Sequence, residues 1–92
     1  MPKIVIYTTA SCPYCLAAKR LLTQKGVSFE EISVDGDPAG RARMTERAGG
    51  RRTVPQIFIG ERHVGGCDDL FALEEAGRLD ALLAVSQQEP ST

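Results

Sequence analysis

The stretch 3–34, KIVIYTTASCPYCLAAKRLLTQKGVSFEEISV, decides the fold of this 92-residue chain. Lys3–Thr8 is β-branched and aromatic with almost no charge, which is typical of a buried strand. Pro13–Lys25 begins with a proline and ends before Gly26, and its leucines gather on one face, so it predicts a helix. Val27–Val34 alternates apolar and polar residues, which predicts a second strand. A strand, a helix and a strand in this order imply a right-handed crossover and a parallel pair of strands.

The rest of the chain predicts helices at both ends of a β-hairpin. Asp37-Pro38 is a helix-start signal, since the aspartate accepts a first-turn amide and the proline needs no donor. Gly60-Glu61 offers a tight turn between two short strands, which predicts a β-hairpin. The expected elements are Pro38–Ala48, Gln56–Ile59, Arg62–Val64, a helix from Asp68 or Asp69 to Gly77, and Leu79–Val85. The order β-α-β-α-β-β-α, with a short final helix, predicts an α/β fold with a mixed four-stranded sheet flanked by helices.

Composition indicates one globular domain over residues 1–86, followed by a flexible polar tail, QQEPST, over 87–92. The formal net charge of −1 does not provide the positive charge that favours binding to nucleic acid or to an anionic membrane. The apolar runs are far shorter than the ~20 residues that a membrane-spanning helix needs, and the N-terminus does not resemble a secretion signal. We therefore expect a cytoplasmic protein whose three cysteines are kept reduced.

Cys12-Pro13-Tyr14-Cys15 lies at the junction between the first predicted strand and the first predicted helix. A cysteine at a helix N-terminus is favoured as a thiolate, because unpaired amides and the helix dipole stabilise the negative charge. Thiolate is the attacking form of cysteine. Cys15 follows three residues later and lies within reach of Cys12, so the pair is able to close a small disulfide.

A CxxC motif is also half of a zinc site. Tetrahedral zinc needs four ligands, and the remaining candidates, His63 and Cys67, form a loose set with no second CxxC. Because the motif follows the first strand of a βαβ pattern, we favour a redox pair and expect no metal site.

Two further segments are candidate binding elements. In Thr53-Val54-Pro55, a cis proline bond would present the Val54 backbone to a peptide-like ligand as an added strand. In GGCDD, residues 65–69, the glycines permit close approach, the helix-start amides suit a carboxylate, and either aspartate suits an ammonium group. A plain glycine turn with a helix cap is the alternative. Arg51 and Arg52 form either a solvated loop or a site for a second carboxylate.

CPYC, TVP and GGCDD, in this order and spacing, resemble the glutaredoxins, and most of all their compact bacterial dithiol type, from about Ile4 to Leu83. The resemblance implies a thioredoxin-like fold, with Cys12 as catalytic and Cys15 as resolving cysteine. It also implies a glutathione site that uses Tyr14, the Val54 backbone, cis Pro55, and the turn 66–69. In that turn Gly66 allows close approach, Cys67 and Asp68 supply backbone amides, and Asp68 or Asp69 meets the ammonium group. Thr8–Ser11 stands where many members carry a lysine. We expect either that Arg51 or Arg52, beside Thr53, takes that role, or that the affinity for glutathione is lower.

The resemblance implies a glutathione-dependent thiol–disulfide oxidoreductase that takes glutathione as co-substrate and reduces glutathionylated and disulfide-containing proteins, as a monomer. Two alternatives stay open: a dithiol redoxin independent of glutathione, which would have no use for an amino-acid site, and a dimer holding a glutathione-ligated [2Fe–2S] cluster, which Pro13 disfavours by stiffening the motif. For Cys67 we favour a buried small hydrophobe over a redox sensor.

Overall fold

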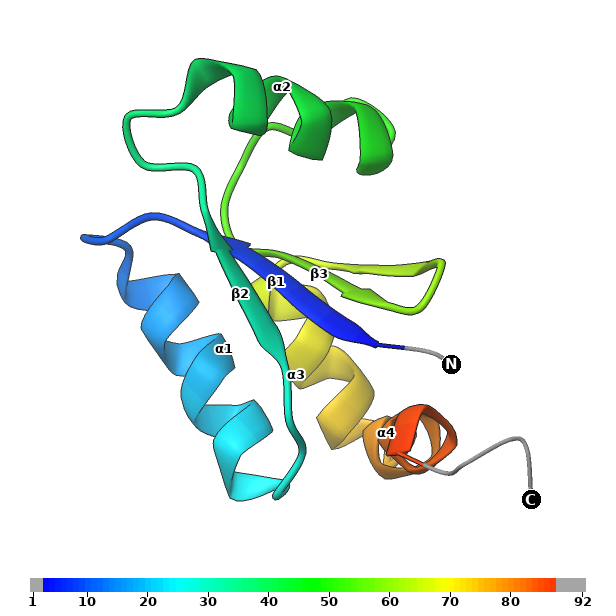
Figure 1. Cartoon of the computed structure of the whole chain (residues 1–92). Helices are drawn as coiled ribbons and strands as arrows, with labels where there is room; N and C mark the ends of the chain where they lie inside the picture. The colour runs from blue at the N-terminus through cyan, green and yellow to red at the C-terminus, as the bar shows by residue number, and fades with distance from the viewer. Residues whose placement is uncertain (1–2, 88–92) are drawn as a thin grey trace.

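The computed structural model describes residues 3–87, and four strands form one mixed sheet at its centre (Figure 1). They are β1 (Ile4–Thr8), β2 (Glu30–Ser33), β3 (Gln56–Ile59) and β4 (Arg62–Gly65), in the spatial order β2-β1-β3-β4. β1 pairs parallel with β2 and antiparallel with β3, and β3 pairs antiparallel with β4. The predicted sheet, with a parallel half and a hairpin half, is therefore confirmed.

Helices cover both faces of this sheet. They are α1 (Pro13–Gln24), α2 (Pro38–Arg47), α3 (Cys67–Glu75) and α4 (Leu79–Gln87). α1 and α3 lie on one face, with α4 at the end of that layer, and α2 lies alone across the other face (Figure 1). α2 begins as predicted, because the Asp37 side chain accepts a hydrogen bond from the Gly40 amide at 3.0 Å and Pro38 occupies the first turn.

The two faces of the sheet carry two separate cores, because successive side chains of a strand point to opposite sides. Ile4 and Ile6 pack with the leucines of α1, α3 and α4. Val5 and Tyr7 pack with Phe58 and with Met44 of α2. All five residues of β1 are buried, which fits its central place in the sheet.

The second strand is shorter than predicted. Residues 27–29 lie outside β2, and the Val27 amide donates to the Leu22 carbonyl at the end of α1 instead of pairing in the sheet. β2 lies at the edge of the sheet, and of its residues only Ile32 is partly buried. Alternation in the sequence therefore identified the strand but overestimated its length.

The helix boundaries differ by a residue or two from those predicted. α3 begins at Cys67, with Gly66 as its cap, and α4 extends to Gln87. The predicted polar tail, apart from Gln87, lies outside the described residues. Within residues 3–87, no helix has the length and apolar character needed to cross a membrane.

Candidate active site

The start of α1 places Cys12 at the surface of the molecule. Cys12 is the N-cap of this helix, with extended backbone angles, and its sulfur accepts a hydrogen bond from the Cys15 amide at 3.3 Å. The Cys12 Sγ also lies 3.7 Å from the Val54 carbonyl oxygen, 42 residues along the chain. The side chain is partly exposed. This thiol is therefore reachable from solvent and accepts a hydrogen bond from a helix-start amide.

Cys15 has the opposite environment. Its side chain is 1% exposed, and burial, followed by its hydrogen bond with Cys12, raises its pKa to about 12. Lys19, one turn along the helix, acts in the other direction and lowers this pKa. Both cysteines are free thiols here. The pair thus combines a reachable sulfur with a buried, protonated one directly beneath it.

The segment before β3 lies beside Cys12 and forms one wall of a pocket next to it. The Val54–Pro55 peptide bond is cis, as the resemblance implied. Gln56 fixes this segment, since its fully buried amide donates to the Thr53 carbonyl at 3.0 Å and to the Thr53 hydroxyl at 3.2 Å. The Gln56 Oε1 in turn lies 2.6 Å from His63 Nε2. Sequence reasoning missed Gln56, although a polar residue inside an apolar strand was a signal for it.

The glycine turn before α3 forms another wall of this pocket. Asp69 reaches back over this turn, and its carboxylate accepts the Gly66 amide at 2.8 Å and the Arg51 guanidinium at 3.0 Å. Gly65 has a φ of +119°, and a Cβ at this position would meet both the Asp69 carboxylate and Arg51. The hydrogen bond from Gly66, and next in strength the contact with Arg51, lower the pKa of Asp69. Asp69 therefore stays ionised while it caps the helix and ties the turn to the Arg51 segment.

These walls enclose a pocket of about 210 Å³ that contains nine of the ten predicted binding residues. Its lining is Tyr14, Arg51, Thr53, Val54, Pro55, Gly66, Cys67, Asp68 and Asp69. Asp68 is exposed, Tyr14 is 63% exposed, and Cys67 is buried in the core, where burial raises the pKa of its thiol. Cys12 borders the pocket through its contact with Val54.

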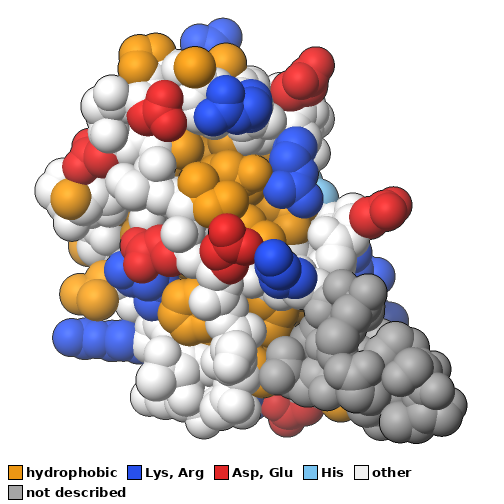
Figure 2. All heavy atoms as spheres, in the orientation of Figure 1, with side chains coloured by type: hydrophobic (Ala, Val, Ile, Leu, Met, Phe, Trp, Pro, Cys, Tyr) orange, Lys and Arg blue, Asp and Glu red, His pale blue; other side chains and the backbone are white. Residues whose placement is uncertain are grey.

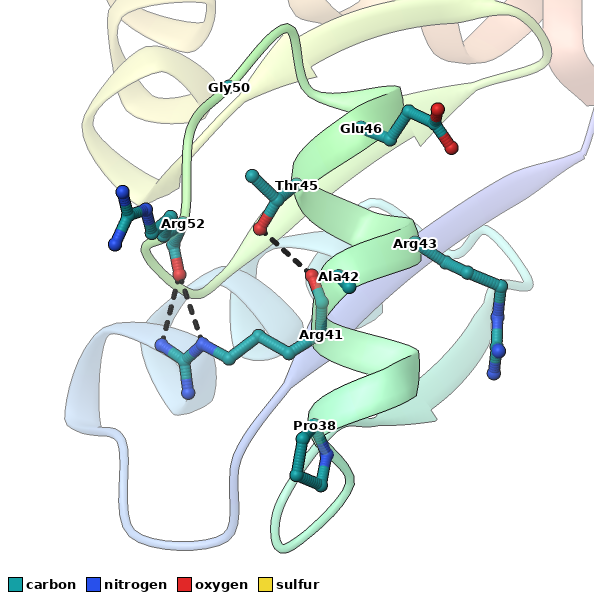
Figure 3. A pocket seen from close by; sticks show the side chains of 8 residues that line it. All are labelled: Pro38, Arg41, Ala42, Arg43, Thr45, Glu46, Gly50 and Arg52. Atoms are coloured by element: carbon teal, nitrogen blue, oxygen red, sulfur yellow. Dashed lines mark hydrogen bonds between the residues drawn. The ribbon is translucent and has the colours of Figure 1, made fainter.

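Arg52 is the predicted binding residue that does not line this pocket. It lines a separate groove between α2 and residues 50–52, where its carbonyl accepts hydrogen bonds from the Arg41 Nε and Nη2 at 3.2 and 3.0 Å (Figure 3). Consecutive side chains of an extended segment point to opposite sides, so Arg51 faces the pocket and Arg52 faces the groove. Of the two arginines considered for the missing lysine, the geometry favours Arg51.

A further hollow of about 380 Å³ opens on the other side of the cysteine pair. Cys12 and Cys15 line it together with Lys19 and Glu31. Glu31 accepts the Thr8 hydroxyl at 2.6 Å and the Lys19 ammonium at 3.0 Å, and these two contacts lower its pKa. No cluster of three or more His, Cys, Asp or Glu side chains among the described residues is arranged to hold a metal ion.

A CxxC pair at the start of a helix, a facing cis proline and this strand order define a thiol–disulfide redox protein of the thioredoxin-like fold. The family model described as glutaredoxin matches residues 4–64, two thirds of the chain, and so the chain belongs to the glutaredoxin family. It is accordingly a glutathione-dependent thiol–disulfide oxidoreductase, with glutathione as its co-substrate.

Individual relatives agree with this assignment. The chain is 66% identical to the glutaredoxin of Pseudomonas aeruginosa over 84 residues, covering 91% of this chain and 99% of that protein. It is 57% identical to glutaredoxin 3 of Escherichia coli over 83 residues, covering 90% and 99%.

Solved structures show the same relationship. The solution structure of glutaredoxin from Brucella melitensis superposes with a TM-score of 0.81 at 54% identity, covering 97% of this chain and 96% of that one. A crystal structure of a buckwheat glutaredoxin–glutathione complex superposes with a TM-score of 0.83 at 32% identity, covering 92% and 79%.

Proposed function

We propose that Cys12 is the nucleophile and Cys15 the resolving thiol, and that the substrates are glutathionylated proteins and protein disulfides. The observation that carries this assignment is the contrast within the pair. Cys12 is reachable and bonded to a helix-start amide, whereas Cys15 is buried with a pKa raised to about 12. An attack that begins at Cys12 needs no movement of the helix, while an attack that begins at Cys15 would need the helix start to open.

With a glutathione mixed disulfide, the Cys12 thiolate attacks the glutathione sulfur, and the substrate leaves as a thiol after taking up a proton. A second glutathione thiolate then attacks the glutathione sulfur of the Cys12–glutathione disulfide, which yields oxidised glutathione and releases the Cys12 thiolate. The cycle consumes one free glutathione, which leaves in oxidised glutathione together with the glutathione removed from the substrate, and the enzyme is unchanged. Cys15 takes no part in this cycle.

With a protein disulfide, Cys12 attacks one sulfur and becomes joined to the substrate. Cys15, as a thiolate, then attacks the Cys12 sulfur, so that the second substrate thiol leaves and a Cys12–Cys15 disulfide forms. Two glutathiones reduce this disulfide by successive exchange. Glutaredoxin potentials of about −200 to −230 mV lie close to that of the glutathione pool, which allows this last step.

The pocket beside Val54 is proposed as the glutathione site. The backbone of Val54 would pair with the cysteinyl part of glutathione, and the amides of Cys67 and Asp68 would meet the γ-glutamyl carboxylate. Because Asp69 already binds Gly66 and Arg51, exposed Asp68 is the freer partner for the ammonium group. Tyr14 would flank the bound tripeptide. Arg51, whose guanidinium lies against the glycine turn and pairs with Asp69, has the charge for the second carboxylate of glutathione.

We further propose that the protein acts as a monomer in the cytoplasm. A catalytic dithiol of this kind depends on a reduced glutathione pool, which that compartment maintains. Every residue proposed for the reaction comes from one chain, so a single copy makes a complete site.

The Cys15→Ser variant tests the division of roles. We expect it to keep most of its activity on a small glutathione mixed disulfide, measured with glutathione, glutathione reductase and NADPH, and to lose most of its activity on a protein disulfide. Cys12→Ser should lose both activities. Equal loss of both activities in Cys15→Ser would show that Cys15 is needed before the resolving step, and the assignment would be wrong.

A further inference from the structure

Positive charge in this chain is concentrated in one short stretch. Residues 41–52 contain five arginines and a single glutamate, a net charge of +4 in a chain whose formal charge is −1. The remainder of the chain therefore carries −5. On the face shown in Figure 2, the part formed by α2 carries basic side chains with acidic ones among them, beside exposed hydrophobic side chains that lie between α2 and the sheet.

Two of these arginines have structural tasks. Arg47 donates to the Tyr7 hydroxyl at 2.9 Å and stacks over the Phe58 ring at 4.2 Å, which attaches α2 to the sheet. Arg51 is paired with Asp69. The guanidinium groups of these two arginines are therefore engaged in contacts within the fold.

The other three arginines line the groove beside α2. Arg41 and Arg52 lie on the side of residues 50–52, whereas the Arg43 side chain extends from the other side of the helix (Figure 3). Arg41 is turned toward this segment and donates to the Arg52 carbonyl, as Figure 3 shows. The guanidinium groups of Arg43 and Arg52 have no ion pair or hydrogen bond with any described residue. The groove has a volume of about 690 Å³, and Pro38 and Ala42 add apolar surface to it. Against the three arginines, Glu46 is the acidic residue of the lining.

The groove lies close to the active site, because Arg52 in its lining is only two residues from Val54 beside Cys12. Arg52 precedes Val54 by two residues, and the Val54 carbonyl oxygen lies 3.7 Å from the Cys12 sulfur. Two residues span at most about 7 Å. A partner that presents a disulfide to Cys12 thus has its neighbouring residues within reach of the groove.

We propose that this groove is a docking surface for an acidic segment of the disulfide-bearing protein. The inference rests on the proposed reduction of protein disulfides and adds a preference among its substrates. Carboxylates next to the disulfide would pair with Arg43 and Arg52, while apolar side chains would pack against Pro38 and Ala42. Such pairing raises the rate of productive encounter and weakens with salt, because the charges remain close to solvent.

The test uses two synthetic disulfide peptides of equal length, one with four Asp and Glu residues beside the disulfide and one with Asn and Gln in their place. We expect a kcat/KM about five- to tenfold higher for the acidic peptide at low salt, falling toward equality at high ionic strength. Arg43→Glu should remove most of this preference. Arg52→Glu should remove it as well, and the KM for glutathione is measured alongside in that variant.

Arg78→Glu is the matched control, since it makes the same charge change directly before α4, at the opposite end of the molecule from α2 (Figure 1). It should keep the preference of the wild-type protein. The small glutathione mixed disulfide should be reduced equally by wild type, Arg43→Glu and Arg78→Glu. Equal rates for the two peptides in the wild type, or equal effects of Arg43→Glu and Arg78→Glu, would overturn the docking surface. Failure to reduce either peptide would instead overturn the proposed function.

Discussion

Asp69→Ala is expected to lower the free energy of unfolding, because the structure gives this carboxylate two partners across the glycine turn. It accepts the Gly66 amide at 2.8 Å and the Arg51 guanidinium at 3.0 Å. A side-chain hydrogen bond at a helix start contributes about 1 kcal/mol. The Arg51 pair contributes about 0–1 kcal/mol, since both side chains are almost half exposed, at 47% and 46%. The loss should therefore be about 1–2 kcal/mol, or a fall in Tm of about 5–15 °C for a domain of this size.

The effect of this substitution should depend on pH in a defined direction. The Gly66 hydrogen bond, and next the Arg51 contact, hold the pKa of Asp69 below its ordinary value. In the unfolded chain the carboxyl takes up its proton at the higher, ordinary pKa. The contribution of Asp69 is therefore complete above that ordinary pKa and is lost as the pH falls through the pKa of the folded state. The measurement is urea unfolding of wild type and Asp69→Ala at a series of pH values from 7 downward.

Two further variants separate the contributions. Asp68→Ala removes an exposed carboxylate next door and should change the unfolding free energy by less than about 0.5 kcal/mol. Arg51→Ala should lose the ion pair but keep the Gly66 cap, so the double variant Arg51→Ala/Asp69→Ala should be less destabilised than the sum of the single variants. If Asp69→Ala unfolds at the same urea concentration as the wild type at pH 7, or if its deficit persists unchanged in acid, the interpretation of this carboxylate as a cap and tie is refuted.

Two other predictions concern the site directly. Iodoacetamide at neutral pH should label Cys12 and leave Cys15 unmodified. The pKa of Cys15, raised from 9.0 to about 12, reduces its thiolate about a thousandfold, and its side chain is 1% exposed. Peptide mass mapping measures the labelling, and comparable labelling of both cysteines would contradict this prediction. Asp68→Asn should raise the KM for glutathione about three- to tenfold, as expected for the loss of a charge-assisted hydrogen bond that solvent weakens. The control Glu61→Gln removes an exposed carboxylate in the β3–β4 turn and should leave this KM unchanged. A normal KM in Asp68→Asn would assign the ammonium group to another partner.

The elements of the fold were predictable because their signals are local. Asp37-Pro38 marks a helix start in any context, and the Asp37 carboxylate caps α2 in the structure. The length of β2 was not predictable in the same way. Val27 turns back to the Leu22 carbonyl at the end of α1, and its place outside the sheet depends on how that helix and strand pack.

Much of the candidate site was also predictable, since its three motifs are short and each carries its own chemistry. What escaped prediction depends on the direction of side chains across the fold. The sequence places Arg51 and Arg52 side by side, yet one lines the pocket and the other lines the α2 groove. Asp69 looked free for a ligand, but its partners are the Gly66 amide and an arginine 18 residues away. Gln56, the polar first residue of a buried strand, stands out among its apolar neighbours, but its bonds to Thr53 depend on how the cis-proline segment folds back.

The position of Cys12 between two hollows bears on how its covalent intermediate is resolved. On one side, the contact with Val54 connects its sulfur to the proposed glutathione pocket. On the other side, Cys12 lines a hollow together with Cys15 and Lys19. In the proposed reaction, a second glutathione would attack the glutathione sulfur of the mixed disulfide with Cys12, whereas Cys15 would attack the Cys12 sulfur itself from the side of the second hollow. Neither needs to displace the other, so the choice between them is set by thiolate availability. The raised pKa of Cys15 limits its share, and the positive charge of Lys19 partly offsets that limit.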